Sequence, residues 1–303
     1  MYHGIINVYK EPGFTSHDVV AKLRGIAGQR KIGHTGTLDP AAEGVLPVCL
    51  GKATRVCDLL TDRSKEYIAV MRLGIMTDTE DMTGVILSEN PVVCTEEEIR
   101  DAVQNFVGDI DQVPPMYSAL KVNGKKLYDL ARQGIEVERK ARRITIHEIE
   151  ILKIELPLVE FRVSCSKGTY IRTLCKDIGE RLGCGAAMEH LTRSRVGEFQ
   201  VEEALTLAQL QAYKDEGRLE EAICPVDLLF ASYPGVRVLP AEERLLLNGN
   251  PLRPDQVEFL PGDDAAEKTT VRVYDTKDQF CGLYEMGSDH RIYRPLKMFL
   301  GEA

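Results

Sequence analysis

The 303-residue sequence contains no apolar run that approaches the ~18 residues of a membrane-spanning helix. Its first residues, MYHGIIN, have neither the basic n-region nor the long apolar h-region of a secretory signal peptide. Low-complexity tracts and internal repeats are also missing, and 44% of the residues are hydrophobic, so most of the chain is expected to fold. These features predict a cytoplasmic, globular protein with no membrane partner.

The eight cysteines form no CxxC pair and no Cys/His cluster. Scattered cysteines of this kind are typical of reduced thiols in a cytoplasmic protein, whereas structural zinc needs closely spaced ligands. The sequence therefore predicts no metal site.

The formal net charge of −9 argues at first against a nucleic-acid partner, but the charge is unevenly distributed. Residues 117–143 hold eight Lys or Arg and three acidic residues, and residues 161–197 hold seven and three. Residues 200–303 hold eleven basic and nineteen acidic residues. A polyanion would therefore bind the first two-thirds of the chain, although solvated basic surfaces would give the same counts.

Strand-like and helix-like stretches are intermixed without the regular βαβ alternation of a doubly wound fold, which predicts an α+β protein with a mixed, mostly antiparallel sheet flanked by helices. Prolines and a change in charge balance near residues 230–236 predict two domains, 1–232 and 233–303. Short strand signals predict that the second is a small β-barrel. The clearest signals for strands are at 3–9, 65–74, 142–155, 159–166, 236–238, 270–274 and 280–284, and those for helices are at 16–28, 52–60, 95–107, 126–133, 169–182 and 205–213.

One stretch, KIGHTGTLDPAAEGVLP at 31–47, combines many turn-forming residues with a His and two carboxylates. This composition beside apolar sequence predicts a loop held against a core. Its glycine spacing differs from that of a P-loop and no Lys precedes Thr37, so nucleotide binding is not predicted. Asp39 precedes Pro40, which restrains its backbone and would aim the carboxylate, but a turn or helix-capping Asp fits the same pattern.

Three other side chains are candidates for a functional site, and each also has an ordinary structural interpretation. His34 could be a structural hydrogen-bonding residue, and Tyr67 a core aromatic residue. Arg172 is expected in the first turn of a helix, where the helix dipole disfavours a cation. It therefore implies a carboxylate or phosphate partner, unless the side chain is simply solvated.

The motif GHTGTLDPxxxGVLP at 33–47 resembles the signature of the TruB family of tRNA pseudouridine synthases. One departure lies at the start of the chain, where the family usually reads KPxG and this sequence reads KEPG at 10–13. The resemblance covers roughly residues 3–215. Five further motifs match the family in order: GFTSHD at 13–18, KEY and RLG within 65–74, TDTxDxxG at 77–84, PPxYSAxKxxG at 114–124 and SCSKGTYIR at 164–172.

The resemblance implies the pseudouridine synthase fold and a specific reaction, in which the uridine at position 55 in the T loop of tRNA becomes pseudouridine. The uracil leaves C1′ of its ribose and rejoins it through C5, so no electrons leave the substrate and no cofactor is implied. Asp39 would act as the nucleophile, or as a base toward the sugar, with Arg172 as its partner. Whether Asp39 attacks C1′, attacks C6 or begins a glycal route stays open.

The resemblance also implies how the substrate is held. Tyr67 would stack on the extruded base and help to remove the C5 proton, and Tyr170 and Leu191 would line the uracil pocket. Asp81 would make a polar contact nearby, and His34 would hold the T loop open. Lys10 is a further expected substrate-binding residue.

The implied partner is the T arm of tRNA, without a guide RNA, and the protein is expected to be a monomer. The stretch RLLLNGNPL at 244–252 resembles more weakly the PUA-like barrel of the family. Three alternatives remain: a guide-RNA-dependent relative, a catalytically inactive RNA-binding or RNA-folding module, and an unrelated carbohydrate or nucleotide enzyme. Guide-dependent relatives carry extensions, whereas this sequence starts close to its first motif.

Overall fold

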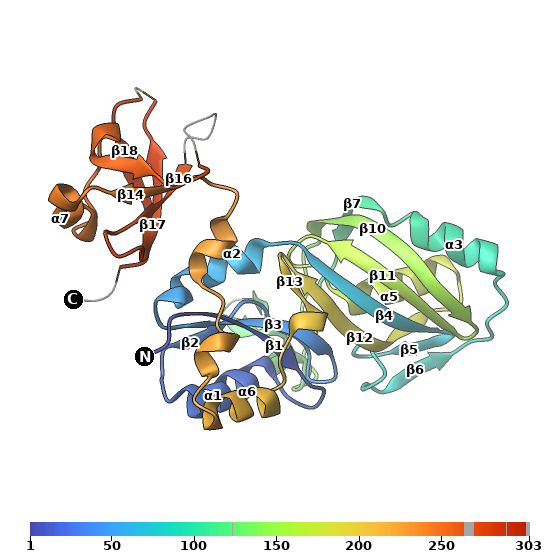
Figure 1. The fold of residues 1–303 in the computed structure, drawn as a ribbon. Helices are drawn as coiled ribbons and strands as arrows, with labels where there is room; N and C mark the ends of the chain where they lie inside the picture. Colours follow the sequence, from blue (N-terminus) through green and yellow to red (C-terminus); the bar gives the residue numbers. More distant parts are fainter. Residues whose placement is uncertain (123, 264–269, 289, 301–303) are drawn as a thin grey trace.

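In the computed structural model, which describes residues 1–122, 124–263, 270–288 and 290–300, a nine-stranded sheet organises the first 200 residues (Figure 1). Its neighbouring strands are antiparallel except for β3 and β12, which run parallel. The mixed, mostly antiparallel sheet confirms the α+β prediction. The strands are, in spatial order, β1 (Gly4–Lys10), β3 (Glu43–Leu50), β12 (Ala186–Val196), β4 (Lys65–Leu73), β11 (Leu158–Cys165), β10 (Arg142–Glu155) and β7 (Gly108–Gln112), with β2 (Ile32–His34) paired to β3 and β13 (Phe199–Gln200) paired to β12.

Strand β12 lies at the centre of this sheet, between β3 and β4, and the sequence did not predict it. Its register with β4 shifts twice, between Met188 and His190 and between Arg193 and Arg195. These irregularities break the period-two pattern that marks a strand in sequence. The central position of β12 therefore depends on its neighbours rather than on its own pattern.

The stretch at 31–47 contains less loop than predicted. Residues 32–34 form β2 and residues from Glu43 onward form β3, so the loop itself covers residues 35–42. Pro47 lies within β3, at a place where β12 no longer pairs with β3 and β2 does not yet do so. An open edge of this kind tolerates a residue without an N–H, which explains the strand despite its proline.

Helices cover the sheet at two places. Helices α3 and α5 pack with β4, β10 and β11 in one cluster of buried side chains, and α1 and α6 pack with β1 and β3 in a second. No helix in the described ranges is long and apolar enough to cross a membrane. The helices are α1 (Ser16–Ala27), α2 (Cys57–Asp62), α3 (Glu96–Gln104), α4 (Leu127–Ala131), α5 (Ile171–Arg181), α6 (Leu207–Asp215) and α7 (Glu243–Leu247).

Local signals set the ends of these helices. Thr15 accepts a hydrogen bond of 3.1 Å from the backbone N–H of Asp18, whose carboxylate bonds back to Thr15, as in a capping box. Gly28, in the left-handed conformation with φ of 64°, ends the same helix. Because such signals are local, the sequence predicted the positions of α1, α3, α5 and α6 to within a few residues.

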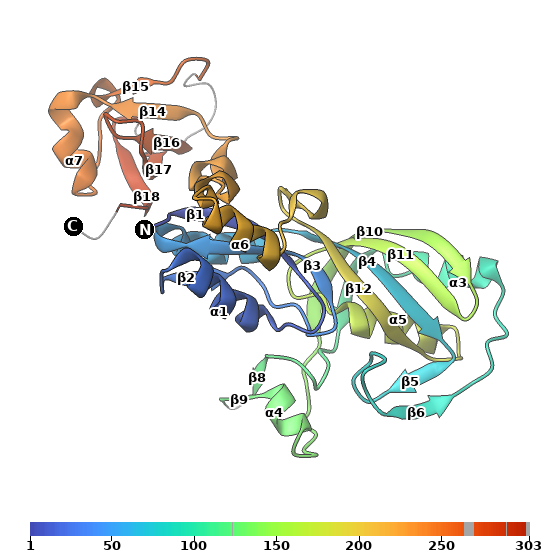
Figure 2. The same cartoon turned by 60° about the horizontal axis from the view of Figure 1, so that its bottom comes forward.

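A small arm projects from the body of the protein (Figure 2). It consists of β8 (Lys121–Val122), β9 (Lys125–Lys126) and α4, within the basic segment 117–143. A second small hairpin, β5 (Ile75–Thr77) and β6 (Ile86–Glu89), follows β4. Both excursions lie in the segments that carry family-like motifs.

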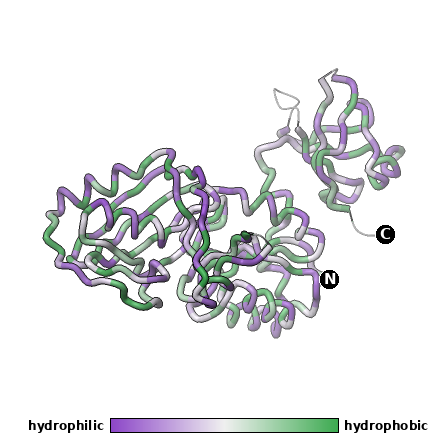
Figure 3. The backbone as a smooth tube through the Cα atoms, turned by 180° about the vertical axis from the view of Figure 1, so that it is seen from behind, coloured by the Kyte–Doolittle hydropathy of each residue, from purple (hydrophilic) through white to green (hydrophobic). Residues whose placement is uncertain are grey.

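The C-terminal part forms a separate five-stranded sheet. Its pairing order β15-β14-β16-β17-β18 does not close on itself within the described residues, so the predicted barrel is corrected to an open sheet. Hydrophobic and hydrophilic stretches alternate along the chain here as in the larger part (Figure 3), as expected for elements buried on one face. The strands are β14 (Gly235–Val238), β15 (Val257–Phe259), β16 (Thr270–Tyr274), β17 (Phe280–Met286) and β18 (Tyr293–Met298).

A shared cluster of buried side chains joins the C-terminal sheet to the first part of the chain. Phe230, Phe280 and Phe299 pack with ring centroids 5.3–6.0 Å apart. The same cluster includes Ile5 and Val45 from the large sheet. The boundary at residues 232/233 therefore stays a prediction, because apolar packing continues across it.

Candidate active site

The loop at residues 35–42 is fixed from beneath by Lys10, the last residue of β1. The Lys10 side chain is fully buried, and its ammonium donates hydrogen bonds to the backbone oxygens of Pro40 (3.1 Å), Ala42 and Glu11 (3.2 Å). From the other side, the hydroxyl of Ser16 accepts a hydrogen bond of 2.9 Å from the Leu38 N–H. The backbone on both sides of Asp39 is thus anchored to the core.

Lys10 was predicted as a substrate-binding residue. In the structure Lys10 has no exposed surface, and its ammonium binds two backbone oxygens of the loop and that of Glu11. Burial lowers the pKa of Lys10 from 10.5 to about 8, while the negative charge of Asp39 opposes that change. The position of Lys10 is therefore one of loop support.

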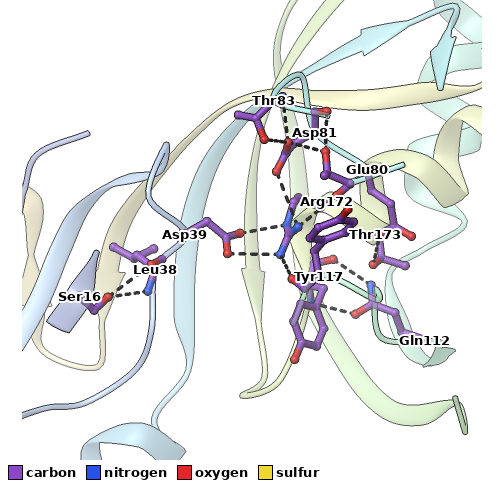
Figure 4. A network of polar contacts seen from close by, with 12 residues as sticks. Ser16, Leu38, Asp39, Glu80, Asp81, Thr83, Gln112, Tyr117, Arg172 and Thr173 are labelled. Carbon is purple, nitrogen blue, oxygen red and sulfur yellow. Dashed lines mark hydrogen bonds and ion pairs between the residues drawn. The ribbon is translucent and has the colours of Figure 1, made fainter. Parts of the chain in front are cut away.

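The carboxylate of Asp39 forms a two-point ion pair with Arg172, from the first turn of α5 (Figure 4). Nε of Arg172 lies 2.9 Å from Oδ2 of Asp39, and Nη2 lies 3.3 Å from Oδ1. The Arg172 side chain is 6% exposed, whereas that of Asp39 is 38% exposed. Arg172 thus lies behind a carboxylate that opens toward solvent, and it has the anionic partner that its unfavourable place in the helix implied.

Arg172 also connects two further segments to the site. It donates to the backbone oxygens of Thr79 (3.1 Å) and Tyr117 (2.9 Å), and its Nη1 lies 3.7 Å from Oδ2 of Asp81. The second oxygen of Asp81 accepts hydrogen bonds from the hydroxyl of Thr79 and from the N–H and hydroxyl of Thr83. The guanidinium is therefore held by many acceptors, which gives it one fixed orientation.

Opposing influences act on the ionisation of Asp39. Desolvation by the surrounding protein is the largest and raises the pKa of the carboxyl above its usual 3.8. The positive charge of Arg172 is the largest influence that lowers this pKa, Asp81 raises it, and Lys10 lowers it. Arg172 therefore favours an ionised carboxylate in a place that otherwise favours the acid.

Tyr67 and Leu191 lie on the neighbouring strands β4 and β12, where Leu191 pairs with Ala69, two residues along from Tyr67. They are 8% and 7% exposed, and they share a buried cluster with Leu38, the neighbour of Asp39. Burial raises the pKa of Tyr67 to about 12, although the positive charge of Arg193 opposes this. Tyr67 is therefore a neutral phenol near neutral pH, placed beside the loop.

Tyr170 immediately precedes α5. The side-chain amide of Gln112 binds its backbone, accepting from the N–H at 2.8 Å and donating to the oxygen at 3.0 Å. Burial raises the pKa of the Tyr170 phenol, and the positive charges of Arg142 and Arg172 oppose this. Gln112 thus fixes the backbone of Tyr170 two residues before Arg172, at the start of α5.

His34 lies at the end of β2, where the loop begins. Its ring is 5.3 Å from that of His17, edge to face, and its Nδ1 accepts a hydrogen bond of 3.3 Å from the Gly36 N–H. Burial, followed by the charges of His17 and Arg193, lowers the pKa of His34, so the ring is neutral near neutral pH. The described contacts place His34 outside the Asp39–Arg172 network.

One residue at the site, Arg193, was missed by the sequence predictions, and a second, Gly44, entered them only as part of the motif at 33–47. Arg193 on β12 is 1% exposed and donates to the backbone oxygen of Val45 at 2.7 Å. Gly44 faces it with a φ of +102°, and a Cβ there would lie 2.3 Å from the Arg193 oxygen. The one sequence signal for Arg193 was its place between buried positions of β12, and the irregular register of that strand conceals its alternating pattern.

The arrangement presents a partly open carboxyl group against a buried cation that favours its ionised form, with a neutral phenol and apolar side chains nearby. A carboxylate in this setting is suited to nucleophilic attack or to removal of a proton from a bound substrate. Within the ranges that the structure covers, no group of three or more His, Cys, Asp or Glu side chains is placed to hold a metal ion.

Comparison with known proteins identifies the family to which this chain belongs. Residues 24–171 match the family model described as TruB family pseudouridylate synthase (N terminal domain), and residues 172–231 match the tRNA pseudouridylate synthase B C-terminal domain. The tRNA pseudouridine synthase B of Lachnoclostridium phytofermentans is 53% identical over 307 residues, covering 98% of this chain and 100% of that protein.

The chain belongs to the TruB family.

A second TruB relative, the tRNA pseudouridine synthase B of Clostridium acetobutylicum, is 47% identical over 287 residues, with 94% of this chain and 96% of that protein covered. Among solved structures, one of an H/ACA RNP bound to a substrate RNA containing 2′-deoxyuridine has a similar chain. It is 30% identical with a TM-score of 0.73, covering 99% of this chain and 86% of that one. A chain in a Cbf5-Nop10-Gar1 complex is similar at 32% identity and a TM-score of 0.72. These likenesses confirm the pseudouridine synthase fold predicted for this TruB-family chain.

Proposed function

We propose that this protein isomerises the uridine at position 55 in the T loop of tRNA to pseudouridine, with Asp39 as the catalytic carboxylate. The family membership and the relatives named tRNA pseudouridine synthase B support tRNA as the substrate class. The observation that carries the catalytic assignment is the Asp39–Arg172 pair, which combines a buried guanidinium with a carboxylate that stays 38% exposed.

The proposed chemistry uses the protein's own side chains. Asp39 acts as an anion, at C1′, at C6 or as a base toward the sugar, and the two hydrogen bonds from Arg172 leave lone pairs of its oxygens free toward the opening. The base leaves C1′ and returns through C5, so bonds are exchanged within one molecule. A uridine in a folded T loop must leave its stack first, and stacking on Tyr67 against Leu191 would offset part of the cost of a few kcal/mol.

The projecting arm gives the proposed RNA interface. Residues 117–143 hold eight Lys or Arg and three acidic residues, and the backbone of Tyr117 is bound to Arg172 at 2.9 Å. The segment that carries this positive charge is therefore attached beside the proposed catalytic pair. We assign this arm to the phosphates of the T arm, where lysine and arginine contribute salt-dependent affinity.

The proposal includes a monomeric enzyme that acts in the cytoplasm without a guide RNA. The bacterial relatives carry the name of a tRNA-modifying enzyme, which supports the guide-independent form. The similar chains in H/ACA and Cbf5 complexes share the fold, and their assemblies are properties of those proteins.

The test is incubation of the purified protein with an unmodified tRNA transcript and no other RNA, followed by mapping of pseudouridine at single-nucleotide resolution. Wild-type protein is expected to convert the T-loop uridine. Asp39→Asn is expected to abolish conversion while tRNA affinity stays within about threefold. Asp62→Asn is the matched control, because Asp62 forms an exposed ion pair with Lys167.

Three outcomes would overturn parts of the proposal. Binding without conversion by the wild-type protein would favour an RNA-binding or RNA-folding module. Conversion only after addition of a guide RNA would favour the guide-dependent class. Normal conversion by Asp39→Asn would show that another group performs the chemistry.

A further inference from the structure

Among the residues that the structure describes, Arg193 is the largest fully buried side chain and has no carboxylate partner. It lies on β12 opposite Gly44 of β3 on one side and Tyr67 of β4 on the other. Its exposure is 1%, and no Asp or Glu in the described part of the chain forms an ion pair with it. A buried charge without a counter-charge is costly, so an arginine at this place calls for a specific reason.

The contacts of Arg193 supply that reason. Its Nε donates to the backbone oxygen of Val45 at 2.7 Å, and its Nη2 donates to the backbone oxygen of Gly36 at 3.4 Å. Tyr67 lies directly opposite Arg193 across β4 and β12, and the charge of the guanidinium opposes the rise that burial causes in the pKa of the Tyr67 phenol. Gly36 and Val45 lie on either side of Asp39 in the sequence, so one side chain holds the backbone on both sides of Asp39 from the strand position that faces Tyr67.

We propose that Arg193 is a positioning residue for the isomerisation, which holds the Asp39 loop at a fixed separation from Tyr67 on the neighbouring strand. This inference rests on the proposed function. It assigns to Arg193 a different task from that of Arg172, which contacts the Asp39 carboxylate itself. A planar guanidinium with donors in several directions can hold both backbone oxygens at once, whereas an ammonium cannot hold them in the same geometry.

Such positioning matters because an error of about 1 Å in the placement of reacting groups can reduce a rate about 100-fold. The carbonyl groups that Arg193 holds lie three residues before and six residues after Asp39 in the sequence. Loss of Arg193 frees both attachment points, while Lys10 still holds Pro40 and Ala42. The loop is therefore expected to stay folded but to sample more positions.

The test compares R193M, R193K and R195M by single-turnover pseudouridine formation at saturating enzyme, by tRNA affinity and by the melting temperature. R195M is the matched control, because Arg195 lies on the same strand, forms a partly exposed pair with Glu66 and does not contact the loop. R193M is expected to lower the rate about 100-fold and to leave affinity within about threefold. R193K should recover part of the rate, and R195M should keep it.

A second measurement does not depend on activity. Amide hydrogen exchange within residues 36–45 is expected to accelerate in R193M, and in R193K to a smaller extent, while α3 and α6 exchange as in the wild type. Unchanged exchange in this loop in both variants would overturn the positioning role, even if the proposed reaction were wrong. An unchanged single-turnover rate per folded molecule in R193M would also overturn the positioning role. Equal fold losses of rate and of tRNA affinity in R193M would do the same.

Discussion

Replacing Arg172 with Met tests the electrostatic basis of the site. The substitution keeps an unbranched side chain of similar length but removes the guanidinium. Asp39 then loses both of its hydrogen bonds from Arg172, of 2.9 and 3.3 Å, while the desolvation that raises its pKa remains. The pKa of Asp39 is therefore expected to rise further above its usual value in the variant.

The size of the effect follows from the burial of the two partners. Loss of one partner from a fully buried ion pair costs about 3–5 kcal/mol. The Asp39 side chain is 38% exposed, so solvent screens part of the interaction. The expected loss is therefore smaller, about 2–3 kcal/mol. If this energy appears in the transition state, kcat/KM falls roughly 30- to 150-fold, because each 1.36 kcal/mol corresponds to tenfold.

The pH dependence separates this explanation from simple misfolding. A carboxylate with a raised pKa is ionised only above that pKa, so the rate falls as the pH decreases through it. With Arg172 removed, this decrease should begin at a higher pH, and the deficit of R172M should be greater at pH 5.5 than at pH 7.5. Single-turnover rates over this range, with R195M as control, provide the measurement. A deficit that is constant across the range would refute the electrostatic argument.

Three further predictions concern other parts of the site. Burial lowers the pKa of Lys10 from 10.5 to about 8, so its ammonium loses a proton and kcat should fall as the pH rises through about 8. K10R should move this fall in kcat to higher pH, and an unmoved fall would show that another group causes it. G44A should destabilise the protein by about 3 kcal/mol in urea unfolding, because its Cβ would lie 2.3 Å from the backbone oxygen of Arg193. The control G108A has a similar φ of +104° but no atom within 4 Å of the added Cβ, and it should cost about 1–2 kcal/mol. Equal costs would contradict the close approach of Gly44 to the Arg193 backbone. K125A should weaken tRNA binding similarly for all sequences and reduce the salt slope by about one, whereas an unchanged slope would remove Lys125 from the phosphate interface.

Much of the fold was predictable because its signals are local. The capping boxes that begin at Thr15 and Thr95 each span only four residues and mark the start of a helix. Strand β4 alternates between buried and partly buried positions along its whole length. The long strand Arg142–Glu155 was predicted with its observed bounds. These elements carry their own pattern, so one sequence was sufficient to locate them.

The centre of the sheet was not predictable in this way. Strand β12 carries polar residues at His190, Arg193 and Arg195, and its irregular register removes the alternation that would identify it. Its neighbours β3 and β4 lie more than 100 residues earlier in the chain. Arg193 was missed for the same reason, since a buried arginine and a solvated one look alike until the strand that carries it has been placed.

Asp39 illustrates a different limit. Its residue type and its proline neighbour allowed a turn, a helix cap or a catalytic carboxylate, and the resemblance to the TruB family made the choice. The structure adds the physical basis of that choice, which is the guanidinium of Arg172, 133 residues away in the sequence. No spacing rule within the loop could have supplied this partner.

The place of β12 in the sheet has a consequence for the biosynthesis of the protein. A ribosome that adds about 5–20 residues per second needs on the order of 10 s to proceed from the end of β4 to the end of β12. During that interval the nascent chain carries β3 and β4 with one edge each awaiting the strand that will join them. The two edges are therefore open to pairing with other chains until residue 196 has emerged. Slow translation between residues 73 and 196 would be expected to lower the yield of folded protein, and rapid delivery of β12 to raise it.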